Sequence, residues 1–208
     1  MITLPNQERS EQTTSEIPLN SEQQEILGLI DVETESIKQA NGVIDLVGVI
    51  AGIKPVAFLD KDQVNADLIG AMGISCESID DESYAISRDE NLSLELKELF
   101  LSRQGESGAA SDEWYRQFGT LLGYPDTAID YYIKRMPTVF TDTPLPFVEP
   151  DSIEGTTTSY FNQLVLSPDN YEAELDEYVK PLEAAVKKLA PKTYEFIEQG
   201  LRDGIISQ

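Results

Sequence analysis

Histidine is absent from this 208-residue sequence, and cysteine occurs once, at Cys76. Without imidazole there is no Ser-His-Asp or Cys-His catalytic arrangement and no His-ligated metal site. A single cysteine also excludes an internal disulfide and a cysteine-rich metal cluster. Catalysis would have to use carboxylates, Tyr, Lys, Arg, Ser or Cys76, and we interpret Cys76 as a small buried side chain. The sequence predicts no cofactor and no metal site.

Basic residues are scarce as well: 15 stand against 38 acidic residues, for a formal net charge of −23. The electrostatic field of such a charge repels phosphate backbones and anionic membrane surfaces. We therefore expect no direct nucleic-acid binding and no membrane binding. Three interpretations of the acidity remain open: a solvated surface adapted to molar intracellular salt, a docking surface for a basic partner, or an acidic mesophilic protein. The acids are spread along the chain, which favours the first.

Long apolar runs and phosphate-binding loops are also missing. The longest apolar run, residues 43–53, is too short to span a bilayer and contains Asp45. Residues 1–19 are polar and acidic and do not resemble a signal peptide. Neither GxxxxGK[ST] nor GxGxxG occurs. We therefore expect a soluble, cytoplasmic protein.

The most strongly patterned stretch is residues 111–136, in which two amphipathic helices are expected to meet at a sharp corner. Apolar residues at i, i+4, i+7 and i+8 predict a helix over residues 112–122. Gly123 then ends this helix, and Pro125 cannot continue it. Asp126 is predicted to cap a second helix. We call residues 122–125 the LGYP corner. The two predicted apolar faces are Trp114, Phe118, Leu121 and Leu122, and Ala128, Ile129, Tyr132, Ile133 and Met136.

The run FGTLLGYPDTAIDYY resembles a segment of DUF483, an archaeal family of unknown function, in which LGYP is followed by a Cys pair. The upstream segments IKPVAFLD and YAISRD are similar to strands of that family, so the resemblance covers roughly residues 40–140. This chain has Thr127 and Ala128 where the family tends to have the cysteines. A metal-binding or redox role suggested by the family's cysteines therefore does not apply to this chain. The resemblance implies an architecture and no reaction.

The remaining patterns predict an α/β (or α+β) fold with a small sheet, flanking helices and a helical C-terminal portion. The chain is long enough for one domain with a sizeable core. The expected parts are a disordered leader (1–20), an α/β domain (21–136), a Pro-rich connector (137–155) and a helical portion (156–208) that packs on the same domain. The elements expected before the corner are helices over 21–41 and 60–73, strands over 43–50, 55–59, 74–78 and 83–87, and a helix after residue 89.

Residues 170–201 carry an apolar stripe that continues through Pro181. Proline inside a helix removes a hydrogen bond and clashes with the preceding turn. The stripe therefore predicts either a kinked helix or two helices, the second beginning at Pro181. Pro191 is expected to precede a last helix.

Arg88 and Asp89 are the first candidates for a functional site. They follow a predicted strand, at the position where α/β folds tend to bind ligands. The alternative interpretation is structural: Asp89 would cap the next helix, and Arg88 would pair with a surface acid.

The second candidate site is the LGYP corner, where aromatic and cationic side chains could bind a planar or anionic small molecule. The alternative is that Trp114 and Tyr124 serve only packing. We interpret the protein as a non-enzymatic small-molecule-binding or protein-interaction module. Two alternatives stay open: a His-independent enzyme that uses carboxylates and Arg, with or without Mg²⁺, and an acidic nucleic-acid mimic that binds a basic protein. The candidate residues at the corner are Trp114, Tyr115, Arg116, Tyr124 and Arg135.

Overall fold

The computed structural model describes residues 18–32, 34–104, 110–138, 160–161 and 166–204. Most of the predicted leader and connector, and most of 156–166, lie outside the described residues. A three-stranded antiparallel sheet in the order β1-β3-β2 forms the centre. Helices flank it, as the sequence predicts. Its strands are β1 (Val56–Asp60), β2 (Ser75–Ser78) and β3 (Ser83–Ser87).

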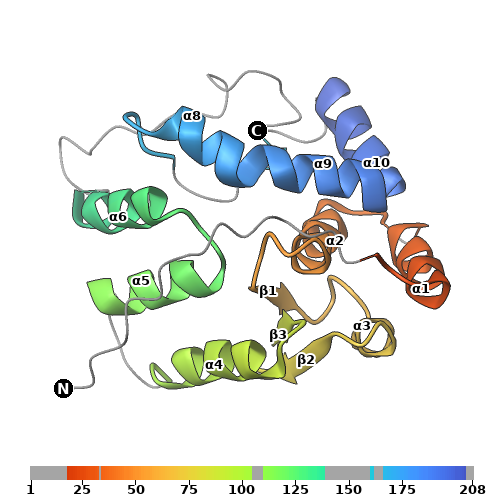
Figure 1. The fold of residues 1–208 in the computed structure, drawn as a ribbon, viewed down its shortest axis with the longest axis horizontal. Helices are drawn as coiled ribbons and strands as arrows, with labels where there is room; N and C mark the ends of the chain where they lie inside the picture. The colour runs from red at the N-terminus through yellow and green to blue at the C-terminus, as the bar shows by residue number, and fades with distance from the viewer. Residues whose placement is uncertain (1–17, 33, 105–109, 139–159, 162–165, 205–208) are drawn as a thin grey trace.

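The helices lie in layers around this sheet (Figure 1). None of those described combines the length and the apolar character needed to cross a bilayer. Before the LGYP corner they are α1 (Ser21–Val32), α2 (Ile37–Ile50), α3 (Ala66–Ala71), α4 (Glu90–Leu101) and α5 (Asp112–Leu121). After it come α6 (Asp126–Arg135), the 3-10 turn η1 (Met136–Thr138), α8 (Tyr171–Glu174), the π-helical turn η3 (Leu175–Val179), α9 (Lys180–Leu189) and α10 (Pro191–Arg202).

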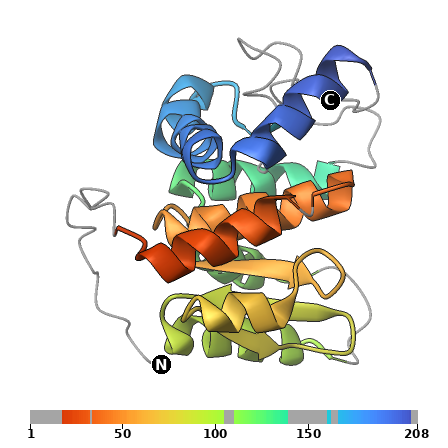
Figure 2. The ribbon, with the colours of Figure 1, turned by 90° about the vertical axis from the view of Figure 1, so that its right-hand side faces the viewer.

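The two faces of the sheet are buried against different helices. Ala57 and Leu59 of β1 join the larger core, which also contains α1, α2, η3, α9 and α10. Val56 and Phe58 point the other way and pack with α4 and α5. This follows from the alternation of side chains along a strand. Figure 2 shows the resulting order, with the C-terminal helices above α2 and the sheet below it.

The strand predicted for residues 43–50 is wrong, because this segment is the second half of α2. Its β-branched composition favours a strand locally. In the fold, however, α2 lies between the sheet and α9, and residues such as Ile44, Leu46 and Val47 are each 0% exposed. A helix buried on opposite sides has no polar stripe, so its helical periodicity is hidden. Tertiary packing decides the conformation.

The single helix predicted over 21–41 is two helices, α1 and α2. The second has its own cap: the Ser36 hydroxyl accepts a hydrogen bond from the Gln39 amide at 3.2 Å. At the end of α1, the buried carboxylate of Asp31 accepts from the backbone N–H groups of Lys192 and Thr193, at 2.9 and 2.7 Å. Asp31 thus supplies the N-terminal cap of α10, whose own sequence provides none. The ends of two distant helices are joined in this way.

The other strands and helices before the corner form within a few residues of their predicted positions. Two helix starts differ from the prediction. The residue preceding α3 is Asn65, whose side chain accepts from the Asp67 amide at 2.8 Å, so the helix begins later than expected. Asp126 is the first residue of α6 and not its cap.

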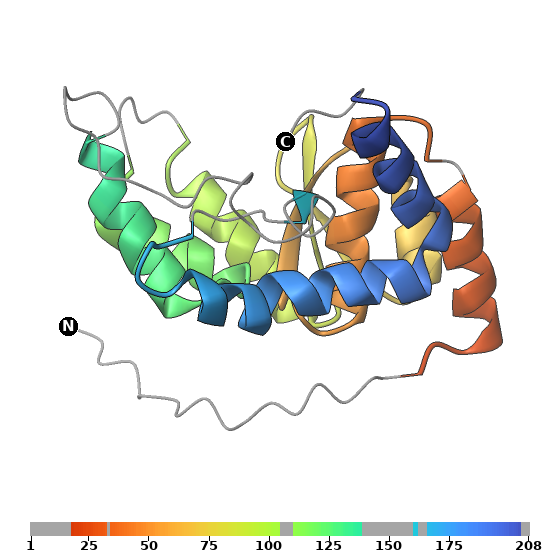
Figure 3. The same cartoon turned by 90° about the horizontal axis from the view of Figure 1, so that it is seen from above.

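The C-terminal stripe forms α8, η3 and α9 in direct succession, and Pro181 is the second residue of α9. The π-helical turn ends at Val179, two residues before the proline. Such a turn changes the hydrogen-bond ladder locally and accommodates the missing N–H. Seen from above, these segments make one rod that extends from near α6 toward α1 (Figure 3). Pro191 begins α10.

Candidate functional site

The LGYP corner is a close contact between the α5–α6 hairpin and the connection from α2 to β1. Gly123 has φ +79°, and the N–H groups of Gly123 and Tyr124 donate to the carbonyls of Thr120 and Gly119, each at 3.0 Å. This is the Schellman pattern at a helix C-terminus. A Cβ on Gly123 would lie 2.6 Å from Pro55 Cδ. The glycine is therefore required both by its conformation and by the contact.

Tyr124 points from the corner into the protein, where a buried polar cluster forms. We use this name for Asp45, Lys54, Tyr124 and Tyr178. The Lys54 side chain is 3% exposed and donates to the carboxylate of Asp45, which is 15% exposed. The rings of Tyr124 and Tyr178 meet edge to face at 5.3 Å. Burial raises the pKa of both tyrosine hydroxyls, so both remain protonated at neutral pH.

Trp114 and Tyr115 lie in a different environment, among the aromatic side chains of α4, α5 and α6. The indole N–H of Trp114 donates to the carbonyl of Leu99 at 3.1 Å, and its ring stacks on Phe118 at 5.1 Å. Tyr115 contacts the edges of Trp114 and Tyr132, at 5.5 and 5.4 Å. These contacts tie α5 to both neighbouring helices.

The two arginines of the predicted corner site lie on the hairpin surface. Arg116 pairs with Asp130 of α6 at 2.6 Å, and both side chains are largely exposed. Arg135 is half-buried at the last residue of α6. The structure thus brings Trp114 and Tyr115 together on one side of the hairpin, whereas Tyr124 contacts the C-terminal rod.

Asp89 and Arg88 have separate structural contacts. Asp89 caps α4 by accepting from the Asn91 amide at 3.0 Å. The Arg88 guanidinium donates to the carbonyl of Ile50 at 3.3 Å, at the C-terminal end of α2. A cation at this end of a helix is electrostatically favourable. Arg88 also lines a cavity of about 190 Å³ together with Ile50 and Met72.

Cys76 of β2 is half-buried and packs against the larger core. Burial raises the pKa of its thiol to about 11, and the neighbouring Glu77 carboxylate acts in the same direction. The thiolate is the nucleophilic form, and it forms only as the pH approaches that value. At neutral pH, Cys76 is thus a poor nucleophile.

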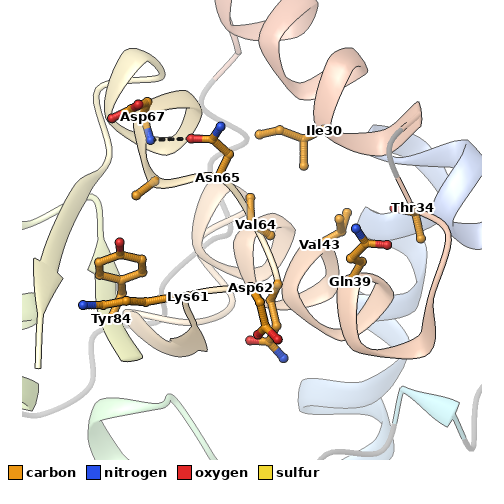
Figure 4. Close-up of a pocket in the computed structure, with 12 residues that line it drawn as sticks. Ile30, Thr34, Gln39, Val43, Lys61, Asp62, Val64, Asn65, Asp67 and Tyr84 are labelled. Carbon is orange, nitrogen blue, oxygen red and sulfur yellow. Dashed lines mark hydrogen bonds between the residues drawn. The ribbon is translucent and has the colours of Figure 1, made fainter. Parts of the chain in front are cut away.

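A larger cavity, of about 440 Å³, opens between the α1–α2 connection and the segment that joins β1 to α3 (Figure 4). Ile30, Val43 and Val64, all buried, form its aliphatic floor. In this view Thr34 and Gln39 lie at one end, and Lys61 and Tyr84 at the other. The rest of the lining comes from Asp62, Gln63, Asn65, Ala66 and Asp67. We call this cavity the α2–α3 pocket.

Three side-chain amides of the α2–α3 pocket are held by local hydrogen bonds through their oxygens. Gln39 Oε1 accepts from the Glu35 amide at 2.9 Å, and Gln63 Oε1 accepts from the Asp60 amide at 2.7 Å. Asn65 Oδ1 accepts from the first turn of α3. No described group accepts a hydrogen bond from any of the three NH₂ groups. Within the described part of the chain, these donors are thus left to water or a ligand.

The charged side chains of the pocket differ in how far they are already paired. Lys38 binds both Asp60 and Asp62, at 3.2 and 2.8 Å, and so fastens the β1–α3 segment to α2. The Lys61 ammonium donates to Ser78 at 3.0 Å and lies 4.9 Å from the centre of the Tyr84 ring. No ion pair to Asp67 is found within the described ranges.

Sequence reasoning missed this pocket, because its lining comes from three separate stretches of the chain, 30–43, 61–67 and position 84. The sequence signal that could have indicated this pocket lies in two helix-capping patterns. The segments 36–39 and 60–63 carry S-x-x-Q and D-x-x-Q patterns. In such patterns the amide oxygen reaches back to a backbone N–H, which leaves the NH₂ group to point elsewhere.

No family model, curated protein or solved structure matches this chain. The resemblance to DUF483 stays a prediction. Over the described residues, no group of three or more Cys, Asp and Glu side chains is placed to hold a metal ion.

Proposed function

We propose that this protein is a non-enzymatic module that binds a small polar molecule in the α2–α3 pocket. The observation that supports the proposal is the set of three amide NH₂ donors, unused among the described residues, around one cavity with an aliphatic floor. Ligand sites typically combine an apolar lining with a few fixed polar groups, and volumes of several hundred Å³ are usual. The cavity of about 440 Å³ has this size, and its lining is mainly polar, which suits a polar ligand.

The pocket is built on a rigid support, which favours binding without a large rearrangement. Val43 and Val64 are 1% and 6% exposed and belong to the main core. A Cβ on Gly42 would lie 2.6 Å from Gln63 Cβ, so α2 and the β1–α3 segment are in direct contact. Polar groups held by packing and by their own hydrogen bonds lose little entropy when a ligand binds.

The test is a saturation-transfer NMR screen against a mixture of monosaccharides, aliphatic amines and carboxylic acids. Ala66 lines the pocket and Ala71 is exposed at the other end of the same helix. We expect a bound component to lose its signal in Ala66→Trp, because the indole fills the cavity, and to keep it in Ala71→Trp. If Ala66→Trp unfolds, Ala66→Leu replaces it. Equal signals in both variants, or no bound component, would overturn the proposal.

The acidic surface is part of the same proposal, as an adaptation to high salt. At a net charge of −23 the folded chain repels itself, and salt screens that repulsion. The screening length falls from about 10 Å at 0.1 M to about 3 Å at 1 M ionic strength. We expect the melting temperature to rise substantially between 0.1 M and 2 M KCl. Choline chloride should act similarly if screening is the cause, and a flat response in both salts would contradict this explanation.

A further inference from the structure

We infer that the ligand of the α2–α3 pocket is an uncharged, hydroxyl-rich molecule, such as a monosaccharide or a cyclic polyol. This inference rests on the proposed function and names its ligand class. It follows from comparing the charges and hydrogen-bonding groups of the lining with the three simplest ligand types: an anion, a cation and a neutral molecule.

An anionic ligand does not fit the charges of the pocket. Asp62 and Asp67 both stand at the rim, and the whole chain carries a net charge of −23. Lys61 is the single basic residue of the described lining, and its ammonium already donates to Ser78 and lies over the Tyr84 ring. A phosphate or carboxylate would enter against this field, and the one cation it meets already has partners.

A cationic ligand fits poorly for the opposite reason. Asp62 is already bound to Lys38, so within the described lining Asp67 alone offers a carboxylate outside an ion pair. The NH₂ groups of Gln39, Gln63 and Asn65 are donors, and an ammonium group offers only donors in return. Donors facing donors leave hydrogen bonds unmade, and burying them in that state is costly.

A hydroxyl group can donate and accept at once, and the lining offers both kinds of partner. The amide NH₂ groups can donate to ligand hydroxyl oxygens, and Asp67 can accept a hydroxyl proton. Ile30, Val43 and Val64 are buried and expose little surface, so a ligand here meets mainly polar groups. The cavity volume of about 440 Å³ lies in the usual range for small-molecule sites, which is room for a monosaccharide.

The Tyr84 ring argues against a flat heteroaromatic ligand. The Lys61 ammonium lies over one face of this ring, 4.9 Å from its centre. A nucleobase would find donors here, but the lining exposes little apolar surface on which it could stack.

The deciding variant is Asn65→Asp, which removes one NH₂ donor and keeps the oxygen that caps α3. Asp and Asn cap helices about equally well, so the fold should persist. The matched control is Asn20→Asp, because Asn20 caps the first turn of α1 in the same way, accepting from the Gln23 amide at 2.9 Å, outside the pocket. The probes are D-glucose, D-galactose and myo-inositol, with putrescine and glucose 6-phosphate for comparison.

We expect at least one neutral probe to bind, and Asn65→Asp to weaken it about three- to tenfold, as for the loss of one hydrogen bond. Asn20→Asp should leave that affinity unchanged. If putrescine or glucose 6-phosphate binds instead, and Ala66→Trp abolishes that binding, the pocket is a ligand site and the neutral-ligand inference is overturned. If no probe binds in a manner sensitive to Ala66→Trp, both the inference and the proposed function fail.

Discussion

Replacing Gly123 with alanine is expected to lower the free energy of unfolding by roughly 2–4 kcal/mol. Two costs add. Gly123 has φ +79°, a conformation that costs a residue with a Cβ about 1–2 kcal/mol. The new Cβ would also lie 2.6 Å from Pro55 Cδ and 2.8 Å from the Ile53 carbonyl oxygen, so the corner would have to move away from the α2–β1 connection. Urea unfolding followed by circular dichroism measures the loss.

Gly52→Ala is the matched control, because Gly52 has φ +73° and a Cβ added there would meet no other group within 4 Å. It should show the conformational cost alone, about 1–2 kcal/mol. The difference between the two variants is then the cost of the close contact at the corner. If the two variants lose equal stability, the contact between Gly123 and Pro55 does not contribute, and the corner is held only by its backbone conformation.

Replacing Lys54 with methionine is expected to cost roughly 3 kcal/mol, because it leaves the Asp45 carboxylate, only 15% exposed, without its Lys54 partner. The Lys54 stem crosses α2 at Gly48, where a Cβ would lie 3.0 Å from Lys54 Cγ and Cδ. Methionine keeps most of this packing and removes the ammonium. Unfolding in urea at pH 7 measures the effect.

Two controls separate the buried charge from general effects of the substitution. Lys97→Met breaks the more exposed Lys97–Glu77 pair, at 3.4 Å, and should cost about 1 kcal/mol or less. The double variant Lys54→Met with Asp45→Leu removes both charges, and it should recover much of the lost stability, since an apolar pair can replace a buried ion pair. If Lys54→Met costs no more than Lys97→Met, the buried polar cluster contributes no more than a surface pair.

The LGYP corner shows which structural features the local sequence can predict. Periodic apolar residues, Gly123 and Pro125 predicted two helices and the turn between them, and the structure confirms all three. The same holds for Asp89, whose capping of α4 was one of the two interpretations left open. These features depend on hydrogen bonds and conformations within a few residues, so the sequence nearby contains the information.

The same sequence could not show what surrounds each element. Tyr124 was predicted to face a pocket with Trp114, but it contacts Tyr178, a residue of the distant π-helical turn. The predicted site grouped residues that are neighbours along the chain. Their side chains point toward different elements, because successive residues of a corner project in different directions.

The sequence by itself determined the absence of imidazole chemistry, the strongly negative charge, the α/β class, most strands and the corner. Tertiary structure alone decided that residues 43–50 are helical, since burial of α2 against both the sheet and α9 outweighs the local preference of β-branched residues. It also decided the α2–α3 pocket, whose floor joins Ile30, Val43 and Val64. Packing brings these side chains together, and no short-range sequence pattern predicts that packing.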